Sequence, residues 1–375
     1  MDVVCFSDIN WDFLWQRHQQ LLTRFPEDWK ILYIQPSFIG VMIKQPTRFL
    51  PRLVKDNIRV VSLLTIPFFD KFSILRKINN LLIVFCTHFF MKIYEIKTPI
   101  VIIYEPRCSC VVGKLNELLV HYEIADDRLE FAKVPKWIKT DIDFLIQNAD
   151  LVTVASQYLY NKLAKKRRHN IFLVGNGVEV EHFKKARENI EIPKDICDIK
   201  KPILGYVGTI GEWFDFPLIE AVLKNFSDVS VVLIGPIYPE QRIEVNRLKK
   251  SYLNFYALGE RPYKLLPNFI RAFDVCIIPF KIYELTRGVN PNKLYEYLAS
   301  GKPVISTALP EVKKYNGTVY VAENYDEFLL YISKALTSTY DLEKFLEIAN
   351  ENTWEEKAKE IVRIIQTEKK EVMVR

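Results

Sequence analysis

The stretch that decides the fold runs from Asn290 to Ser306 and reads NPNKLYEYLASGKPVIS. Its Asn-Pro start is typical of a helix N-terminus, because asparagine caps free N–H groups and proline fits the first turn. Gly301 comes after the last apolar repeat and predicts the end of the helix. The apolar run Pro303–Ser306 follows and predicts a buried strand. A helix that leads into a strand in this way is the repeating unit of a parallel α/β sheet.

The same alternation extends outward over most of the 375 residues. Short runs rich in Val, Ile and Leu fall into two series, and continuous runs of this kind predict strands that helices cover on both faces. The first series is Val3–Phe6, Ile31–Ile34, Arg59–Leu63, Ile100–Tyr104, Val120–Tyr122, Leu151–Val154 and Ile171–Val174. The second is Ile203–Val207, Val229–Ile234, Leu253–Leu258, Val275–Pro279, Pro303–Ser306 and Thr318–Val321. We therefore predict an α/β protein with two doubly wound, Rossmann-like lobes.

Domain boundaries follow from length and composition. A chain of 375 residues exceeds what one hydrophobic core usually serves. Residues 179–201 are charged, contain proline and lack a sustained period, so they predict a linker. We expect the first lobe over 1–178, the second over 202–345, and a C-terminal helix over 346–375 that packs back on the first lobe.

Composition excludes several classes of protein. With 49% hydrophobic and 26% charged residues the chain is globular rather than disordered. The six cysteines are scattered and form no paired CxxC, so we expect reduced thiols, a cytoplasmic location and no bound metal. No signal peptide is expected before the first strand, and the longest apolar stretch, Leu81–Ile93, is shorter than the ~20 residues of a membrane span.

The formal net charge of +6 is concentrated in one region. Residues 41–97 hold ten Lys or Arg and three acidic residues, a net charge of +7, together with many phenylalanines. Such a segment fits contact with an anionic membrane surface, although the phenylalanines could equally pack inside the lobe. No nucleic-acid-binding module accompanies it, so we expect no nucleic-acid partner.

Two features of the second series predict an anion site. Gly208-Thr209-Ile210-Gly211 follows the strand Ile203–Val207, and its glycines permit a tight turn and close approach of an anion. Asn292, Lys293 and Glu296 share one face of the predicted helix. A lysine in a first turn opposes the helix dipole, so a bound phosphate would explain it, whereas a solvated helix face is the alternative.

The region from Asp274 through Val304 resembles the donor site of GT-B glycosyltransferases of group 1. The resemblance implies that Glu296 grips the ribose of a nucleotide, that Lys293 holds its diphosphate, and that Gly208, Thr209 and Ile210 lie beside the phosphates. It implies a nucleotide-sugar-binding second lobe that faces an acceptor-binding first lobe across a cleft. Ser7, Trp11 and Gln16-Arg17 resemble the subgroup that builds bacterial surface polysaccharides.

The sequence departs from this family at one position. Many retaining members carry a second glutamate eight residues before the ribose-binding one, and here that position is Gly288. The sugar and a retaining mechanism are therefore both open. An inverting enzyme needs a general base on the acceptor hydroxyl.

The candidate bases are Asp126 and Asp127, which follow the strand Val120–Tyr122. Carboxyl ends of parallel strands are where such folds place their chemistry, whereas an aspartate there can also be a simple helix cap. Asp126 is the preferred candidate. Related inverting enzymes use a first-lobe aspartate in this role.

The sequence thus predicts a metal-independent glycosyltransferase without a cofactor. Its donor would be a nucleoside diphosphate sugar, UDP-linked as the first expectation. Its acceptor would be a glycan or a lipid-linked molecule in surface polysaccharide synthesis, reached by peripheral contact with the inner face of the membrane. The alternatives are a UDP-sugar 2-epimerase of the same fold and a non-enzymatic protein that binds membranes or polyanions. No esterase, protease or zinc-hydrolase motif occurs in the sequence.

Overall fold

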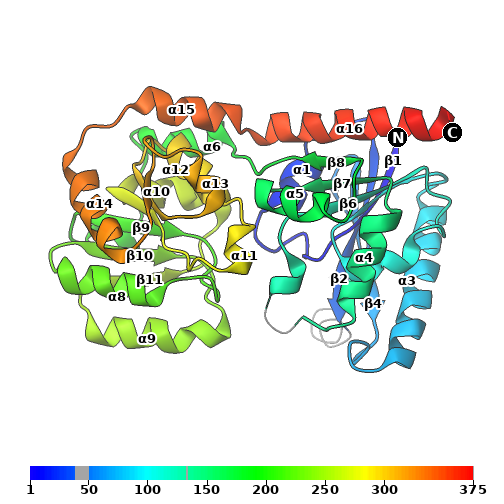
Figure 1. Ribbon diagram of the computed structural model, residues 1–375, viewed down its shortest axis with the longest axis horizontal. Coiled ribbons are helices and arrows are strands. Elements are labelled where there is room, and N and C mark those ends of the chain that lie inside the picture. Colours follow the sequence, from blue (N-terminus) through cyan, green and yellow to red (C-terminus); the bar gives the residue numbers. More distant parts are fainter. Residues whose placement is uncertain (39–49, 132–133, 375) are drawn as a thin grey trace. The chain divides into compact units, whose positions relative to one another are not determined.

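The computed structural model describes residues 1–38, 50–131 and 134–374, and divides the chain into two compact units. Unit 1 comprises Met1–Val174 and Lys357–Arg375, and unit 2 comprises Gly175–Glu356. Each unit is an open α/β sheet with its own hydrophobic core (Figure 1).

The sheet of unit 1 has, among the described residues, the strand order β3-β4-β2-β1-β5-β6-β7-β8. Its strands are parallel except for β3, which pairs antiparallel with β4 at the edge. The strands are β1 (Asp2–Phe6), β2 (Lys30–Phe38), β3 (Arg52–Lys55), β4 (Ile58–Thr65), β5 (Ile100–Ile103), β6 (Leu119–Ile124), β7 (Leu151–Val154) and β8 (Ile171–Leu173).

The helices of unit 1 are distributed around this sheet. They are α1 (Arg17–Leu22), α3 (Ser73–Ile93), α4 (Ile138–Asn148) and α5 (Gln157–Ala164), with 3₁₀ turns η2 (Pro106–Val111) and η3 (Arg128–Glu130). Apolar residues of α3, α4 and α5 join one core with Val4, Phe6 and Leu32 of the central strands. The order of strands places β1, β5 and β6 side by side, so their carboxyl ends form one edge of the sheet.

Unit 2 has a six-stranded sheet of order β11-β10-β9-β12-β13-β14, whose neighbouring strands all pair in parallel. The strands are β9 (Ile203–Val207), β10 (Ser230–Ile234), β11 (Phe255–Gly259), β12 (Val275–Ile278), β13 (Val304–Thr307) and β14 (Tyr320–Ala322). Both the strand order and the buried apolar runs agree with the predicted doubly wound architecture.

Helices cover both faces of this second sheet (Figure 1). One group packs α8 (Phe216–Asn225) against α14 (Tyr325–Thr337) and, through Glu220 and Arg247, against α9 (Arg242–Ser251). The other group includes α6 (Val180–Phe183), α10 (Leu266–Ala272), α12 (Asn292–Ala299) and α15 (Leu342–Glu351). Further short elements are η4 (Lys184–Arg187), α7 (Lys194–Cys197), η5 (Pro239–Gln241), η6 (Tyr263–Leu265), α11 (Glu284–Arg287) and α13 (Pro310–Lys313).

Residues 179–201 differ from the linker that their composition suggests. They form α6, η4 and α7 and bury Phe183, Ala186 and Ile196 in the core of unit 2. These three apolar side chains pack the segment against unit 2. They are separated by many charged residues and follow no helical or strand period, so the sequence does not predict the packing. The first unit also ends earlier along the chain than expected, at Val174.

The final helix, α16 (Trp354–Val374), begins in unit 2 and continues into unit 1. Its residues from Lys357 onward belong to unit 1, where Ile361 and Ile365 are buried and Asn170 Nδ2 donates to Glu368 at 2.6 Å. The last residues of the chain therefore belong to its first unit. Residues 346–356, which the prediction included in that helix, belong to unit 2.

Candidate functional site

The glycine loop after β9 is a place where two backbones touch. Gly208 has φ +146°, a conformation that side-chain-bearing residues rarely adopt. A Cβ added to Gly235, which follows β10, would lie 2.1 Å from the carbonyl oxygen of Gly208. Glycine at both positions thus lets the ends of two neighbouring strands converge at the carboxyl edge of the sheet, where α/β folds bind their ligands.

The N–H groups of this loop are not equally available. Gly208 donates to Ile234 at 2.8 Å and Ile210 donates to Pro236 at 2.9 Å. The side chain of Ile210 is buried in the core. Of the three residues predicted to lie beside phosphates, Thr209 is therefore the one whose N–H is not engaged in these two bonds.

Helix α12 brings Lys293 to the glycine loop. A Cβ on Gly208 would lie 3.0 Å from Cε of Lys293 and 3.3 Å from its Nζ, so the ammonium group sits directly beside the loop. The same ammonium lies 4.9 Å from the ring centre of Phe280 and 5.5 Å from that of Tyr206. These aromatic faces hold the charge in place by cation–π attraction.

The start of α12 offers a further polar atom. The helix begins at Asn292 with Pro291 as its N-cap, one residue later than the Asn-Pro pattern predicts. Within the part of the chain that the structure describes, the buried Oδ1 of Asn292 has no hydrogen-bond partner. A buried acceptor of this kind is costly unless a ligand or water satisfies it.

Glu296 lies one turn after Lys293 on the same helix. Desolvation raises the pKa of Glu296 to about 7, the charge of Glu179 adds to this, and Lys293 opposes it. A carboxyl group that changes charge near neutral pH is unusual for a solvated helix surface and typical of a binding site. Lys293 thus lies beside the glycine loop, and Asn292 and Glu296 lie on the same helix, Glu296 within electrostatic reach of Lys293.

Tyr297 connects this helix to the strand that carries the loop. Its hydroxyl accepts a hydrogen bond of 2.8 Å from the N–H of Val207, the last residue of β9. Both residues are buried, and the sequence gives no sign of the contact because tyrosines at helical spacing normally indicate packing alone. The bond fixes the position of α12 against the glycine loop.

The two candidate bases of unit 1 have different surroundings. Asp127 is buried, accepts from the N–H of Leu129 at the start of η3, and lies 2.6 Å from Nζ of Lys162. These are the contacts of a structural cap. Asp126 has an exposed side chain, yet desolvation by the surrounding protein and the nearby charge of Asp8 raise its pKa to about 6.

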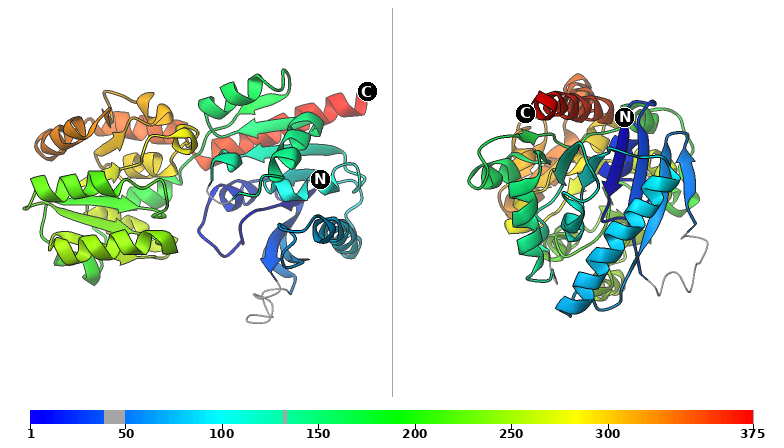
Figure 2. Two further views of the ribbon diagram at one scale, coloured as in Figure 1. Left: turned by 60° about the horizontal axis from the view of Figure 1, so that its bottom comes forward. Right: turned by 90° about the vertical axis from the view of Figure 1, so that its right-hand side faces the viewer.

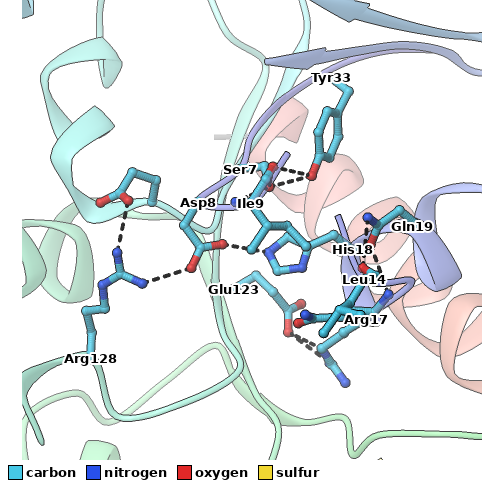
Figure 3. Close-up of polar contacts among 12 residues, drawn as sticks. Ser7, Asp8, Ile9, Leu14, Arg17, His18, Gln19, Tyr33, Glu123 and Arg128 are labelled. Carbon is cyan, nitrogen blue, oxygen red and sulfur yellow. Dashed lines mark hydrogen bonds and ion pairs between the residues drawn. The ribbon is translucent and has the colours of Figure 1, made fainter. Parts of the chain in front are cut away.

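Asp8 is the centre of a polar cluster that no local sequence pattern indicates (Figure 3). Asp8 contacts His18 Nε2 at 2.9 Å and Arg128 at 2.9 Å, and Arg128 also contacts Glu105 at 3.1 Å. Desolvation would raise the pKa of Asp8, but His18 and Arg128 outweigh it and hold the pKa below its ordinary value. Asp8 therefore carries the negative charge that raises the pKa of Asp126.

A buried ion pair lies near this cluster. Arg17 contacts Glu123 at 2.8 Å, and both side chains are almost fully buried (Figure 3). Burial would raise the pKa of Glu123, but Arg17, His121 and Thr153 lower it to about 2. The pair is thus charged at neutral pH and fixes α1 to the end of β6.

One signal could have located these residues from the sequence. Asp8 and Glu105 each lie two residues after the last residue of β1 and β5, and Glu123 lies at the end of β6. These three strands are neighbours in the sheet, so their acids meet at its carboxyl edge. Among the described residues, no group of three or more His, Cys, Asp or Glu side chains is placed to hold a metal ion.

Comparison with known proteins places this geometry in context. Residues 201–338 match the family model described as Glycosyl transferases group 1. The chain is 31% identical over 174 residues to the putative teichuronic acid biosynthesis glycosyltransferase TuaH of Bacillus subtilis (strain 168). That match covers 45% of this chain and 43% of TuaH, so it spans less than half of the curated relative.

Solved structures match over nearly the whole chain. Sucrose-phosphate synthase from Thermosynechococcus elongatus superposes with a TM-score of 0.77 at 15% identity, covering 98% of both chains. The structure described as trehalose-6-phosphate from E. coli bound with UDP-2-fluoro glucose superposes with a TM-score of 0.73 at 13% identity. The match covers 98% of this chain and 99% of that chain. Anabaena HepE in complex with UDP and glucose superposes with a TM-score of 0.71 at 13% identity. The match covers 97% of this chain and 99% of that chain. These likenesses confirm the predicted GT-B fold.

Proposed function

We propose, from the premise that residues 201–338 belong to the glycosyl transferases group 1 family, that this chain is a glycosyltransferase. It moves a sugar from a nucleoside diphosphate sugar to a glycan or lipid-linked acceptor in surface polysaccharide synthesis. The observation that supports this best is the position of Lys293 beside Gly208, with Glu296 one turn further along the same helix.

The donor site would be divided between these groups. The ammonium of Lys293, the N–H of Thr209 and the N-terminus of α12 all favour a diphosphate. Glu296, as a carboxylate, would accept hydrogen bonds from two adjacent ribose hydroxyls. Neither a cofactor nor a metal is required, because fixed positive charge can stabilise the departing diphosphate.

Uridine diphosphate is the nucleotide we propose. Two of the solved structures that share this fold were bound to UDP or to UDP-2-fluoro glucose, and the curated relative is named for teichuronic acid biosynthesis. An acceptor of that kind, grown on a lipid, would place the enzyme at the inner face of the cytoplasmic membrane.

Asp126 is the proposed general base. The oxygen of the acceptor hydroxyl forms a bond to the anomeric carbon of the donor, the bond from that carbon to the diphosphate breaks, and the acceptor proton passes to Asp126. A pKa of about 6 leaves this carboxylate mostly ionised at neutral pH and able to accept a proton. With a base in place and glycine at position 288, we propose inversion at the anomeric carbon.

The first experiment is calorimetric titration of UDP, GDP, ADP and dTDP into the full chain. We expect selective binding of UDP that is weakened ~10-fold or more by Lys293→Ala and by Glu296→Ala, since each removes a charge-assisted contact. Lys250→Ala and Glu347→Ala change exposed residues of α9 and α15 and serve as matched controls.

Two results would redirect the assignment. A folded protein that binds none of the four nucleotides would overturn the donor site and favour the non-enzymatic alternative. Formation of a new UDP-sugar without any acceptor, followed by NMR spectroscopy, would identify the 2-epimerase instead.

A further inference from the structure

Helix α3 exposes large apolar side chains along one face. Phe85 and Leu81 each have 70% of their surface exposed. The exposed apolar residues of the helix are Ile74, Ile78, Leu81, Leu82, Phe85, Phe89 and Ile93. Their spacing of three, four and one residues places them on a single continuous strip. Figure 2 (right) shows α3 on the outside of unit 1.

The opposite face of α3 is of mixed polarity, and Val84, Cys86 and Phe90 of the helix are partly buried against the core of unit 1. The residues buried against the lobe are Asn79, Ile83, Thr87 and Met91. Asn79 accepts a hydrogen bond of 3.0 Å from the N–H of Ile66, and Thr87 donates to the carbonyl of Ile83 at 2.7 Å. A surface helix normally keeps its large apolar side chains on its buried face, whereas α3 carries them on its exposed face as well.

The charged side chains of α3 itself are all basic. No acidic residue lies within Ser73–Ile93, whereas Lys77 and Lys92 are exposed on the helix. Lys71 precedes it, beside the exposed rings of Phe68 and Phe72. Lys44 and Arg48, which belong to the predicted basic segment, lie outside the described residues.

We propose that α3 lies in the plane of an anionic lipid bilayer, with this strip in the headgroup region and its lysines on lipid phosphates. Apolar side chains beside basic ones, on one helix face, are the features of an interfacial helix. This inference rests on the proposed function only in that a lipid-linked acceptor explains why the surface is needed. It narrows membrane contact from the whole basic segment to one helix face.

Two other arrangements fit less well. The length and composition of α3 would also allow it to cross a bilayer, but one face of the helix is packed on β4 and η2 and would have to be withdrawn from them. A second copy of the chain could cover the strip, but the two helices would then bring their lysines together with no acid on either helix.

The test is flotation of the full chain with two kinds of vesicles, phosphatidylglycerol mixed with phosphatidylcholine and phosphatidylcholine alone. We expect salt-sensitive binding to the anionic vesicles. Phe85→Ser with Phe89→Ser is expected to weaken it ~10-fold or more, since two large apolar side chains leave the headgroup region. Lys77→Gln with Lys92→Gln is expected to weaken binding to the anionic vesicles selectively.

Ile243→Ser with Leu253→Ser is the matched control, because both side chains are at least as exposed as Phe85 but belong to unit 2. The inference is overturned if the full chain does not bind vesicles, or if the Phe85/Phe89 variant binds them like the parent. It is also overturned if alkaline carbonate fails to release the protein from membranes, because that result indicates a helix that crosses the bilayer. A dimer that the phenylalanine variant dissociates, without vesicle binding, would assign the strip to self-association. UDP titration of the same variant separates the two proposals, since nucleotide affinity is expected to stay unchanged.

Discussion

The ammonium group of Lys293 lies so close to Gly208 that a methyl group on the glycine would come within 3.3 Å of it. Gly208→Ala is therefore expected to weaken nucleotide binding ~10-fold, by displacing the lysine, and to destabilise the fold by about 1–3 kcal/mol, because φ +146° is strained for alanine. Calorimetry and urea unfolding measure the two effects. Gly317→Ala is a suitable control, since Gly317 also has a positive φ but nothing within 4 Å of an added Cβ. Equal affinity in parent and Gly208→Ala protein would remove the glycine loop from the site.

Nucleotide affinity should depend on pH through Glu296. The pKa of about 7 means that the carboxyl is increasingly protonated below neutral pH and then loses its capacity to accept two hydrogen bonds. Affinity is expected to fall as pH drops from 8 through 7 to 6, by up to ~10-fold per pH unit below the pKa. In Glu296→Gln the affinity should be lower and this dependence should be lost. A parallel pH profile in both proteins, measured by calorimetry, would assign the titration to another group.

Asp126 and Asp127 are expected to respond differently to substitution. Asp126→Asn should lower kcat ~10²–10⁴-fold with unchanged UDP affinity, because it removes the proposed base. In the parent enzyme kcat should fall as pH drops below about 6, where Asp126 becomes protonated. Asp127→Asn should instead leave kcat unchanged and reduce stability by about 1 kcal/mol or less, because asparagine can still cap η3 and only the ion pair with Lys162 is lost. Near-parental turnover of Asp126→Asn would exclude it as the base.

The buried pair of Arg17 and Glu123 should be important for folding. Arg17→Met leaves an uncompensated buried carboxylate and is expected to cost about 3–5 kcal/mol in the free energy of unfolding at pH 7. The pKa of Glu123, about 2, is depressed from 4.5, so its stabilising contribution is present above pH 4.5 and is lost as pH falls towards 2. The Arg17→Met variant should therefore lose less stability over that pH range. Arg52→Met, at a more exposed ion pair, should change stability by less than about 1 kcal/mol.

Transferase activity is expected to persist in excess EDTA. The positive charge that would stabilise the departing diphosphate belongs to Lys293 and the helix N-terminus, which a chelator does not remove. A radiolabelled sugar-transfer assay with and without EDTA, repeated after adding Mg²⁺, tests this directly. Loss of transfer that Mg²⁺ restores would show that a metal is required.

The sequence predicted those parts of the fold that depend on local pattern. Buried parallel strands appear as continuous apolar runs, so each predicted strand has a counterpart in the two sheets. Strand β3 was missed because Arg52–Lys55 is short and basic, and its pairing with β4 depends on the neighbouring strand rather than on its own residues. The prediction of a linker over residues 179–201 is wrong because its three buried apolar residues follow no period and pack only against other elements of unit 2.

The candidate donor site was predictable because its residues lie within one helix and one loop. The contact between Tyr297 and Val207 was not, since it joins residues 90 positions apart. The cluster around Asp8 and Arg128 likewise spans 120 positions. Only the strand order brings those side chains together, and no local spacing encodes that order.

The exposed apolar strip of α3 also governs how the purified protein will behave. A continuous apolar strip in contact with water favours association as concentration rises, and salt strengthens this by screening the lysines that keep molecules apart. Preparations at high ionic strength should therefore aggregate at a lower protein concentration than preparations at low ionic strength. Short-chain lipid or mild detergent, which covers the strip, should keep the protein monodisperse for crystallisation or cryo-electron microscopy.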